Sequence, residues 1–221
     1  MRRVAPTTIH EGVDASLFRP NPRAAGEFRR ARRLGNEPFL LAVGALSAEK
    51  RYPLLFDALH LLGDAAPRLV ICGEGADERE LRARASALGL RVRFEGRIAQ
   101  RELIGAYNAC TALVHPGAVE TFGLAVLEAM SCARPVIAAA GGALPEVVGT
   151  DGSCGVLFSP HSAWDMESMI RRILGDTNRG AEMGARARER ARQEFSVTSM
   201  ERAYAWLVAR HSGFVLHARS E

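Results

Sequence analysis

Two glutamates separated by seven residues, Glu120 and Glu128, carry the clearest chemical signal in the chain. Glu120 follows a Pro-Gly breaker, and Glu128 lies in a run whose apolar residues recur at helical spacing, so we expect a turn and then a helix. The amides of Phe122, Gly123 and Leu124 then start that helix, where they lack intrahelical partners and attract an anion, usually a phosphate. Because like charges repel, we expect both carboxylates to accept hydrogen bonds from hydroxyl groups, of which sugars carry many.

The same pattern also has a purely structural interpretation. Glu120 could simply cap or precede a helix, and Glu128 could be a solvated helical residue. Charge placement alone favours this structural interpretation.

A strand and a helix must position these residues. The apolar run at 111–115, closed by Pro116 and Gly117, predicts a buried parallel strand. Ligands of open α/β sheets bind beyond the carboxyl ends of such strands, against helix N-termini. Strands alternate with helices about six times along the chain, which predicts a Rossmann-like, doubly wound parallel sheet of about six strands flanked by helices, in the α/β class.

The other elements follow from local patterns. We expect strands at 39–45, 68–72, 91–94, 135–139 and 155–158, and helices at 52–62, 77–88, 101–109, 144–148, 163–174, 178–194 and 196–210. Ser162 is the expected N-cap of the helix at 163–174. A basic patch, Arg29, Arg30, Arg32 and Arg33, lies in a short helix between two prolines, and we interpret it as a solvated face.

The run from Glu120 to Cys132 resembles the signature of the retaining glycosyltransferases of family four (glycosyl transferases group 1), in which Phe-Gly follows the first Glu and Glu-Ala-Met ends the motif. The match continues through 133–137 (Ala-Arg-Pro-Val-Ile), 141–148 (Gly-Gly-Ala-Leu-Pro-Glu-Val-Val) and 155–158 (Gly-Val-Leu-Phe). The resemblance covers residues 9–210 and implies the donor-binding, C-terminal half of a two-domain GT-B fold.

The resemblance implies roles for the central residues. Glu128 would hold the ribose hydroxyls of a nucleotide sugar, and the amides of 122–124 with Lys50 would hold its diphosphate. Glu120 would bind sugar hydroxyls and orient the anomeric carbon, so Glu120 and Lys50 are the implied catalytic pair. Helix amides and a cation can stabilise developing phosphate charge without a metal.

Five more residues at strand ends are implied to contact the donor. Gly44 ends the first strand, and Gly73 and Gly75 form a Gly-rich turn near the nucleotide, with a plain tight turn as the equal alternative. Backbone groups of the loop with Arg97 and Ile98 would meet the nucleobase.

The loop at 44–51 departs from the family, which commonly reads Gly-Arg-Leu and then Lys-Gly. Here Ala45 replaces the Arg and Arg51 replaces the Gly, whereas Lys50 is kept. Lys50 is the one lysine in the chain, against 28 arginines, a bias typical of a GC-rich bacterial genome. A lone lysine must fall somewhere, so the bias proves nothing. Without its Arg partner the site is expected to grip a diphosphate less tightly, and Arg51 is a weak replacement.

Composition excludes several other classes of function. A length of 221 residues and an apolar content of 48% fit one globular domain, and a net charge of +4 gives no case for nucleic acid. The four cysteines are widely spaced, which indicates buried thiols in a reducing cytoplasm rather than metal ligands. There is no Asp-x-Asp metal motif, no signal peptide and no apolar run of roughly 20 residues. We therefore expect no metal, no cofactor and no transmembrane segment.

These patterns predict a domain over 1–210 and a tail over 211–221, with the N-terminal acceptor domain of the family absent. The aromatic residues of the last helix would form an exposed patch, for which a partner acceptor domain or a second copy of the chain is the expected cover. We expect a cytoplasmic protein, with a peripheral position at the inner membrane face left open.

Two hypotheses about function follow. The first is glycosyl transfer from a nucleotide diphosphate sugar to an acceptor hydroxyl with retention, by this domain together with a missing or partner N-terminal domain. The second is a non-catalytic nucleotide-sugar-binding or structural remnant, which Ala45 and the missing domain favour. A fragment of a longer open reading frame is a further alternative.

Overall fold

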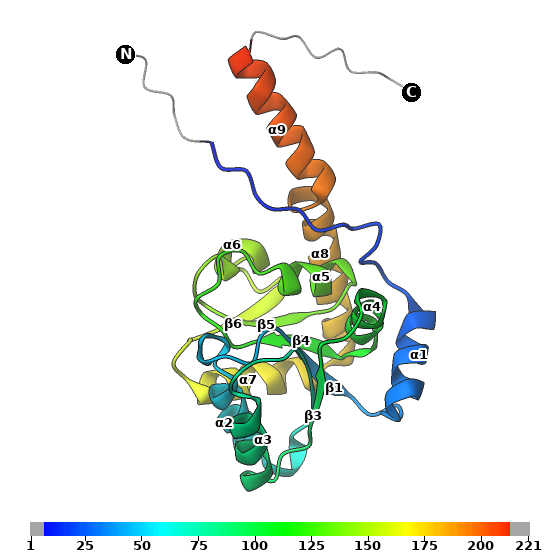
Figure 1. The fold of residues 1–221 in the computed structure, drawn as a ribbon, viewed down its shortest axis with the longest axis vertical. Helices are drawn as coiled ribbons and strands as arrows, with labels where there is room; N and C mark the ends of the chain where they lie inside the picture. Colours follow the sequence, from blue (N-terminus) through cyan, green and yellow to red (C-terminus); the bar gives the residue numbers. More distant parts are fainter. Residues whose placement is uncertain (1–6, 213–221) are drawn as a thin grey trace.

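Six short parallel strands form the centre of the structure, a computed structural model that describes residues 7–212 (Figure 1). The strands are β1 (Phe39–Val43), β2 (Arg68–Cys72), β3 (Val92–Gly96), β4 (Ala112–His115), β5 (Val136–Ala139) and β6 (Gly155–Phe158). They pair in the order β3-β2-β1-β4-β5-β6. The order therefore reverses between β1 and β4, which lie side by side although a long stretch of chain separates them.

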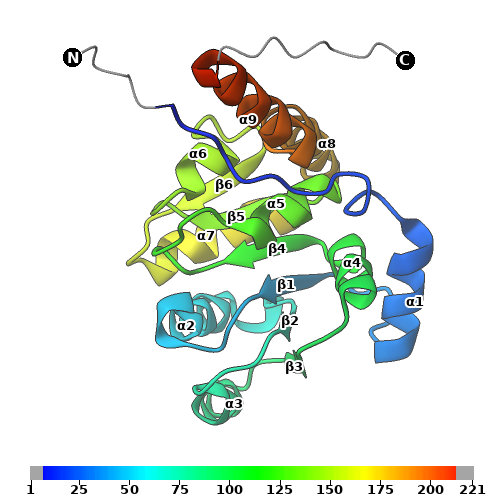
Figure 2. The same cartoon turned by 45° about the horizontal axis from the view of Figure 1, so that its top comes forward.

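Helices cover both faces of the sheet. They are α1 (Pro22–Arg32), α2 (Tyr52–Leu62), α3 (Glu78–Ala87), α4 (Gln100–Ala109), α5 (Leu124–Ser131), α6 (Leu144–Val148), α7 (Ala163–Leu174), α8 (Thr177–Glu194) and α9 (Val197–Ser212), with the 3₁₀ turns η1 (Ala48–Lys50) and η2 (Gly63–Ala65). Helices α2, α3 and α7 lie on one face, and α1, α4, α5 and α6 lie on the other (Figure 2). These layers confirm the predicted doubly wound α/β class.

The inner strands are mostly apolar because both of their faces are covered, whereas the edge strand β3 carries Arg93 and Glu95. Leu40 and Leu41 of β1, Leu69 of β2 and Leu113 of β4 are fully buried. The register pairs Leu40 with Leu69, and Leu41 with Leu113. Burying one such side chain contributes about 1.5–3 kcal/mol, so the central strands form a rigid support for the loops at their ends.

Several predicted boundaries are confirmed to the residue, namely those of α2, β2, α6, β6 and α7. Ser162 caps α7 as expected, because its side chain accepts a hydrogen bond from the amide of Asp165 at 3.0 Å. Strand β1 ends at Val43, earlier than predicted, since Gly44 has a φ of +149° that ordinary strand residues do not adopt. All four cysteines are buried free thiols.

The interpretation of the basic patch as a solvated face is wrong for Arg29 and Arg32, whereas Arg30 and Arg33 are exposed as expected. The Arg29 guanidinium donates to the carbonyl oxygens of Gly35, Glu37 and Ala109, which ties α1 to the loop before β1 and to the end of α4. The other arginine of α1 that points inward, Arg32, takes part in an ion-pair network.

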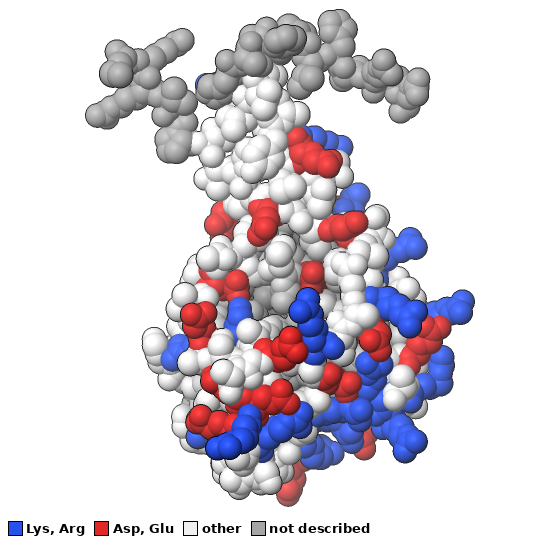
Figure 3. Space-filling model, viewed as in Figure 1, with Lys and Arg blue, Asp and Glu red and all other residues white. Residues whose placement is uncertain are grey.

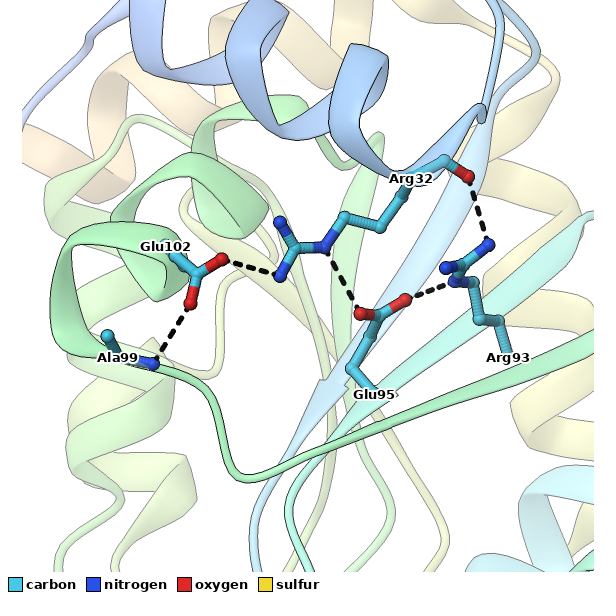
Figure 4. A network of polar contacts seen from close by, with 5 residues as sticks. All are labelled: Arg32, Arg93, Glu95, Ala99 and Glu102. Atoms are coloured by element: carbon cyan, nitrogen blue, oxygen red, sulfur yellow. Dashed lines mark hydrogen bonds and ion pairs between the residues drawn. The ribbon is translucent and has the colours of Figure 1, made fainter.

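That network joins α1, β3 and α4 (Figure 4). Arg32 donates to Glu95 at 3.1 Å and to Glu102 at 2.8 Å, and Arg93 contacts Glu95 and also donates to the carbonyl oxygen of Arg32. The second Glu102 oxygen accepts from the amide of Ala99 at the start of α4. The side chains of Arg32 and Glu95 are only 13% and 9% exposed, so the network is a structural joint.

Helix α9 extends away from the layers (Figure 1), and the surface of α9 seen in Figure 3 is largely uncharged. Tyr204, Trp206 and Val208 are exposed on it, as predicted for the last helix. The helix includes 211 and 212, which we had assigned to a tail; the remaining tail residues, 213–221, lie outside the described residues. No helix within residues 7–212 is long and apolar enough to span a bilayer.

Candidate functional site

The candidate site lies at the carboxyl ends of β1 and β4, where the strand order reverses. Parallel sheets leave a crevice at such a switch point, because the loops on its two sides turn toward opposite faces. The loop after β1 carries Lys50 at the end of η1, and the loop after β4 carries Glu120. The sheet thus brings together two residues that are 70 positions apart.

Glu120 is the centre of this site. Its Oε2 atom accepts from Lys50 Nζ at 2.7 Å and lies 3.1 Å from Nε2 of His115, the last residue of β4. The Glu120 side chain is 15% exposed. The hydrogen bond from His115, with that from Lys50, outweighs the cost of burial and lowers the pKa of Glu120 to about 2. Glu120 is therefore a carboxylate at any physiological pH.

Glycines allow the Lys50 loop to approach Glu120. A Cβ on Gly44 would lie 3.4 Å from Lys50 Cε, and one on Gly117 would lie 3.4 Å from Lys50 Cδ and 3.2 Å from the carbonyl oxygen of Glu49. The stem of the lysine thus passes between two positions that carry no side chain. Arg51, the next residue, ends η1 with a φ of +52°, the left-handed conformation for which the family uses glycine.

The turn that precedes α5 lies beside this cluster. Gly123 is the N-cap of α5, with a φ of +93°, and a Cβ there would come within 2.9 Å of the Leu144 side chain. Phe122 lies outside the helix and packs near the rings of His10 and Phe195. Helix α5 begins at Leu124, which is 42% exposed, so of the three residues expected to start the helix only Leu124 lies within it, and the binding of an anion by these amides stays a prediction.

Glu128 has a different environment from Glu120. It lies within α5, and its Oε2 accepts a hydrogen bond of 2.7 Å from the hydroxyl of Tyr107, a fully buried residue of α4. Burial raises the pKa of Glu128, and the Tyr107 hydrogen bond only partly opposes this effect. The protein's own partners of the two carboxylates also differ, because a hydroxyl contacts Glu128 whereas an ammonium and an imidazole contact Glu120. The contact of both carboxylates with sugar hydroxyls stays a prediction.

The Gly-rich turn after β2 packs against the loop after β1. A Cβ on Gly73 would lie 1.9 Å from the carbonyl oxygen of Gly44, and a Cβ on Gly75 would lie 2.3 Å from that of Leu46. The Leu46 amide also donates to the Glu74 carbonyl oxygen at 3.0 Å. Close packing therefore explains both glycines, and their contact with a nucleotide stays a prediction, as does that of Gly44.

The Arg97–Ile98 loop lies at the same edge but after β3, the outer strand of the sheet. The Arg97 side chain is 84% exposed, and its ion-pair partner is Glu74 at 4.0 Å. Ile98 packs against the core. The structure thus does not join Arg97 to the Lys50–Glu120 cluster, and the role of this loop at a nucleobase stays a prediction.

The family's missing arginine is not replaced within the cluster. Ala45 is exposed, and Arg51 Nη2 contacts His161 Nδ1 at 3.1 Å, so its guanidinium is directed to the loop after β6. Within residues 7–212, no group of three or more His, Cys, Asp or Glu side chains is arranged to hold a metal ion.

Sequence reasoning missed two residues that hold the carboxylates. His115 is a polar residue at the carboxyl end of an otherwise apolar strand, five positions before Glu120, and that position was a usable signal. Tyr107 had none, because its contact with Glu128 depends on how α4 packs beside α5.

Comparisons with known proteins agree with this geometry. The family described as "Glycosyl transferases group 1" matches residues 25–192. A sulfoquinovosyl transferase of Arabidopsis thaliana is 34% identical over 185 residues, covering 81% of this chain and 35% of the relative. A D-inositol 3-phosphate glycosyltransferase 1 of Catenulispora acidiphila is 35% identical over 198 residues, covering 83% of this chain and 47% of the relative.

Solved structures are similar over nearly the whole chain. Anabaena HepE in complex with UDP and glucose matches with a TM-score of 0.84 and 27% identity, over 92% of this chain and 56% of that one. Sucrose-phosphate synthase from Thermosynechococcus elongatus matches with a TM-score of 0.83 and 29% identity, over 93% of this chain and 52% of that one. The chain thus spans about half the length, or less, of these proteins.

Proposed function

This chain belongs to the glycosyl transferases group 1 family, and from that premise we propose that it is the donor-binding domain of a retaining glycosyltransferase. It binds a nucleotide diphosphate sugar at the ends of β1 and β4 and transfers the sugar to an acceptor hydroxyl. The single observation that carries the proposal is the convergence of Lys50, His115 and Glu120 at the strand switch point, beside the start of α5.

Two features bind the donor diphosphate. The first is the N-terminus of α5, whose free amides and helix dipole attract anions. The second is Lys50, whose ammonium forms strong charge-assisted hydrogen bonds to phosphate oxygens. Gly123 keeps the turn bare, so phosphate oxygens can reach the backbone. The same groups stabilise the charge that develops on the leaving diphosphate, and no metal is needed for that step.

The two glutamates recognise the sugars of the donor. Glu128, held by Tyr107, accepts hydrogen bonds from the ribose hydroxyls. Glu120, a permanent anion, accepts hydrogen bonds from hydroxyls of the transferred sugar and orients its anomeric carbon. The acceptor hydroxyl then attacks from the face that the diphosphate leaves, so that the configuration is retained.

The acceptor is bound by a part of the enzyme other than this domain. The relatives are about twice as long as the chain or longer, and the uncharged, exposed side chains of α9 fit a surface that another domain or a second copy covers. The four buried free thiols suit a cytoplasmic location.

Calorimetric titration with UDP, GDP and ADP tests the proposal. One nucleotide should bind at micromolar to millimolar concentration, and Glu128→Ala should abolish that binding. Glu182→Ala, an exposed substitution on α8, is the matched control and should bind as the wild type does. If none of the three nucleotides binds at millimolar concentration, the proposal is wrong.

Ala45 supports a second candidate, a non-catalytic nucleotide-sugar-binding remnant. With no guanidinium beside Lys50, the diphosphate loses one expected cation. The remnant hypothesis predicts no sugar transfer when the domain is joined to an acceptor domain of a relative. Transfer that Glu120→Ala abolishes would exclude it, and restored or improved transfer in Ala45→Arg would identify the missing cation as the limiting feature.

A further inference from the structure

We propose that His115 is the positioning residue of this site. The Lys50–Glu120 ion pair opens when a diphosphate enters, and the His115–Glu120 hydrogen bond persists and keeps the carboxylate in place for the sugar. This inference rests on the proposed function and deepens it, because it assigns different fates to the two contacts of Glu120.

The first argument is that one oxygen atom holds both contacts. Glu120 Oε2 lies 2.7 Å from Lys50 Nζ and 3.1 Å from His115 Nε2. A diphosphate carries more negative charge than a carboxylate, so it competes strongly for the ammonium. In the structure the Glu120 carboxylate thus occupies the place beside Lys50 that a phosphate would take.

The second argument is that the two donors are anchored differently. His115 is 3% exposed, lies in β4, and its backbone is paired with Ala138 of β5. Lys50 ends a 3₁₀ turn, is 22% exposed at its side chain, and has a flexible four-carbon stem. Only the lysine can move without disturbing the sheet.

The third argument is the bare surface along the lysine stem. A Cβ on Gly44 would lie 3.4 Å from its Cε atom and one on Gly117 would lie 3.4 Å from its Cδ atom, so both loops leave room along the stem at these positions. This room favours a turn of the ammonium from Glu120 toward an anion at the start of α5.

The fourth argument is the need for a second anchor. Once Lys50 has turned to the diphosphate, two anionic groups lie close together, and repulsion drives the free carboxylate away. His115 Nε2 faces Glu120, so its N–H donates in both the neutral and the charged imidazole. The hydrogen bond opposes that movement and keeps the Glu120 carboxylate directed at the donor sugar.

The first experiment uses the fact that Lys50 is the only lysine. Protein grown with ¹³C-lysine gives one side-chain Cε signal in a two-dimensional NMR spectrum. Without any ligand, Glu120→Gln should shift this signal, because the ion pair is lost. UDP should shift the wild-type signal as well, with GDP and ADP titrated in parallel. A nucleotide that binds by calorimetry and leaves the signal unmoved would overturn the inference.

The second experiment separates the sugar from the diphosphate. The test uses the nucleotide that calorimetry finds to bind and its sugar conjugate, written here for UDP and UDP-glucose. His115→Leu should leave UDP affinity within about twofold of wild type and weaken UDP-glucose binding about tenfold or more, the effect of losing one hydrogen bond to a charged group. His115→Gln, whose amide nitrogen can take the place of Nε2, should restore UDP-glucose affinity to within about threefold. His60→Leu, an exposed substitution on α2, is the control.

The outcomes distinguish this inference from the proposed function. If neither UDP, GDP nor ADP binds, the proposed function is wrong and this inference falls with it. If UDP binds but His115→Leu weakens UDP and UDP-glucose equally, or weakens neither, only this inference is wrong. The lysine signal tests the opening of the ion pair without any histidine variant, and His115→Gln keeps the role of His115 testable if His115→Leu does not fold: equal weakening of diphosphate and sugar conjugate in His115→Gln would overturn the inference.

Discussion

The molecule contains two partly buried clusters of cations and carboxylates that look alike in composition and differ in arrangement. In the α1–β3–α4 network, the two arginines and two glutamates balance, and Arg32 bridges separate partners (Figure 4). At the ends of β1 and β4, one oxygen of Glu120 faces both Lys50 and His115.

The surroundings of the two clusters also differ. The network joins the sides of packed elements, and backbone groups of Arg32 and Ala99 complete its hydrogen bonds. The Glu120 cluster lies on loops at the switch point, with glycines along the lysine and a helix N-terminus beside it. A balanced network closed by backbone contacts holds a fold together, whereas a shared carboxylate at strand ends can exchange one partner for a ligand.

The strongest test of this contrast is Arg32→Met. It leaves Glu95, which is 9% exposed, with Arg93 as its remaining partner and removes the arginine from Glu102, so we expect a loss of about 3 kcal/mol in the free energy of unfolding. Chemical denaturation followed by circular dichroism measures the change. Arg23→Met, on a pair in which the arginine is 90% exposed, should change stability by less than about 1 kcal/mol. Equal effects of the two variants would mean that the network is not the joint described above.

Lys50→Met should reduce ligand affinity more than it reduces stability. Its stability should fall by less than that of Arg32→Met, because Lys50 is more exposed than Arg32 and His115 still contacts Glu120. Nucleoside diphosphate affinity should fall about thirtyfold, equivalent to about 2 kcal/mol, because a charge-assisted contact is lost. Calorimetry and denaturation on the same preparation measure both quantities. A variant that unfolds readily yet binds normally would place Lys50 with the structural network.

Tyr107→Phe tests a residue that belongs to both settings, since it is buried in the core and holds a carboxylate of the site. Removing its hydroxyl leaves Glu128 without that hydrogen bond and should cost about 1–2 kcal/mol of stability. Nucleotide affinity should fall a few-fold, because Glu128 loses its fixed orientation. Cys110→Ala on the same side of the sheet would control for loss of packing. Unchanged nucleotide affinity in Tyr107→Phe would show that Glu128 does not depend on Tyr107.

The smallest effect concerns the pH dependence of stability. The pKa of Glu120 is about 2 in the folded chain, against an ordinary value of 4.5, so its contacts stabilise the fold above pH 4.5. That contribution is lost as the pH falls from about 4.5 toward about 2. Arg32 also lowers the pKa of Glu102, so acid weakens the network as well. The difference between wild type and Glu120→Gln isolates the site: it should shrink in this acid range, and a constant difference would contradict the assignment.

Local patterns were sufficient to predict most of the fold. Apolar runs with Gly or Pro behind them located the buried strands, and Ser162 marked the start of α7. Boundaries failed where conformation departs from the strand or helix pattern, as at Gly44 and Phe122. Strand order decides which distant residues meet, and no local pattern encodes it.

The same limit applies to the site. The motif identified Glu120 and Glu128, and the resemblance identified Lys50, but the contact between Lys50 and Glu120 required β4 to lie next to β1. The interpretation of Arg32 failed for the same reason, since its partners lie 63 and 70 positions away. Charges that look solvated in the sequence can find partners only through the tertiary fold.

The buried thiols can report which parts of the domain open locally. Cys72, Cys110, Cys132 and Cys154 lie at the end of β2, before β4, after α5 and before β6. Burial raises the pKa of the first three to about 12, so an alkylating reagent meets almost no thiolate until the chain opens locally. Mass spectrometry can record the order in which the four cysteines are alkylated. That order would rank the regions of the sheet by their free energy of local opening, without any substitution.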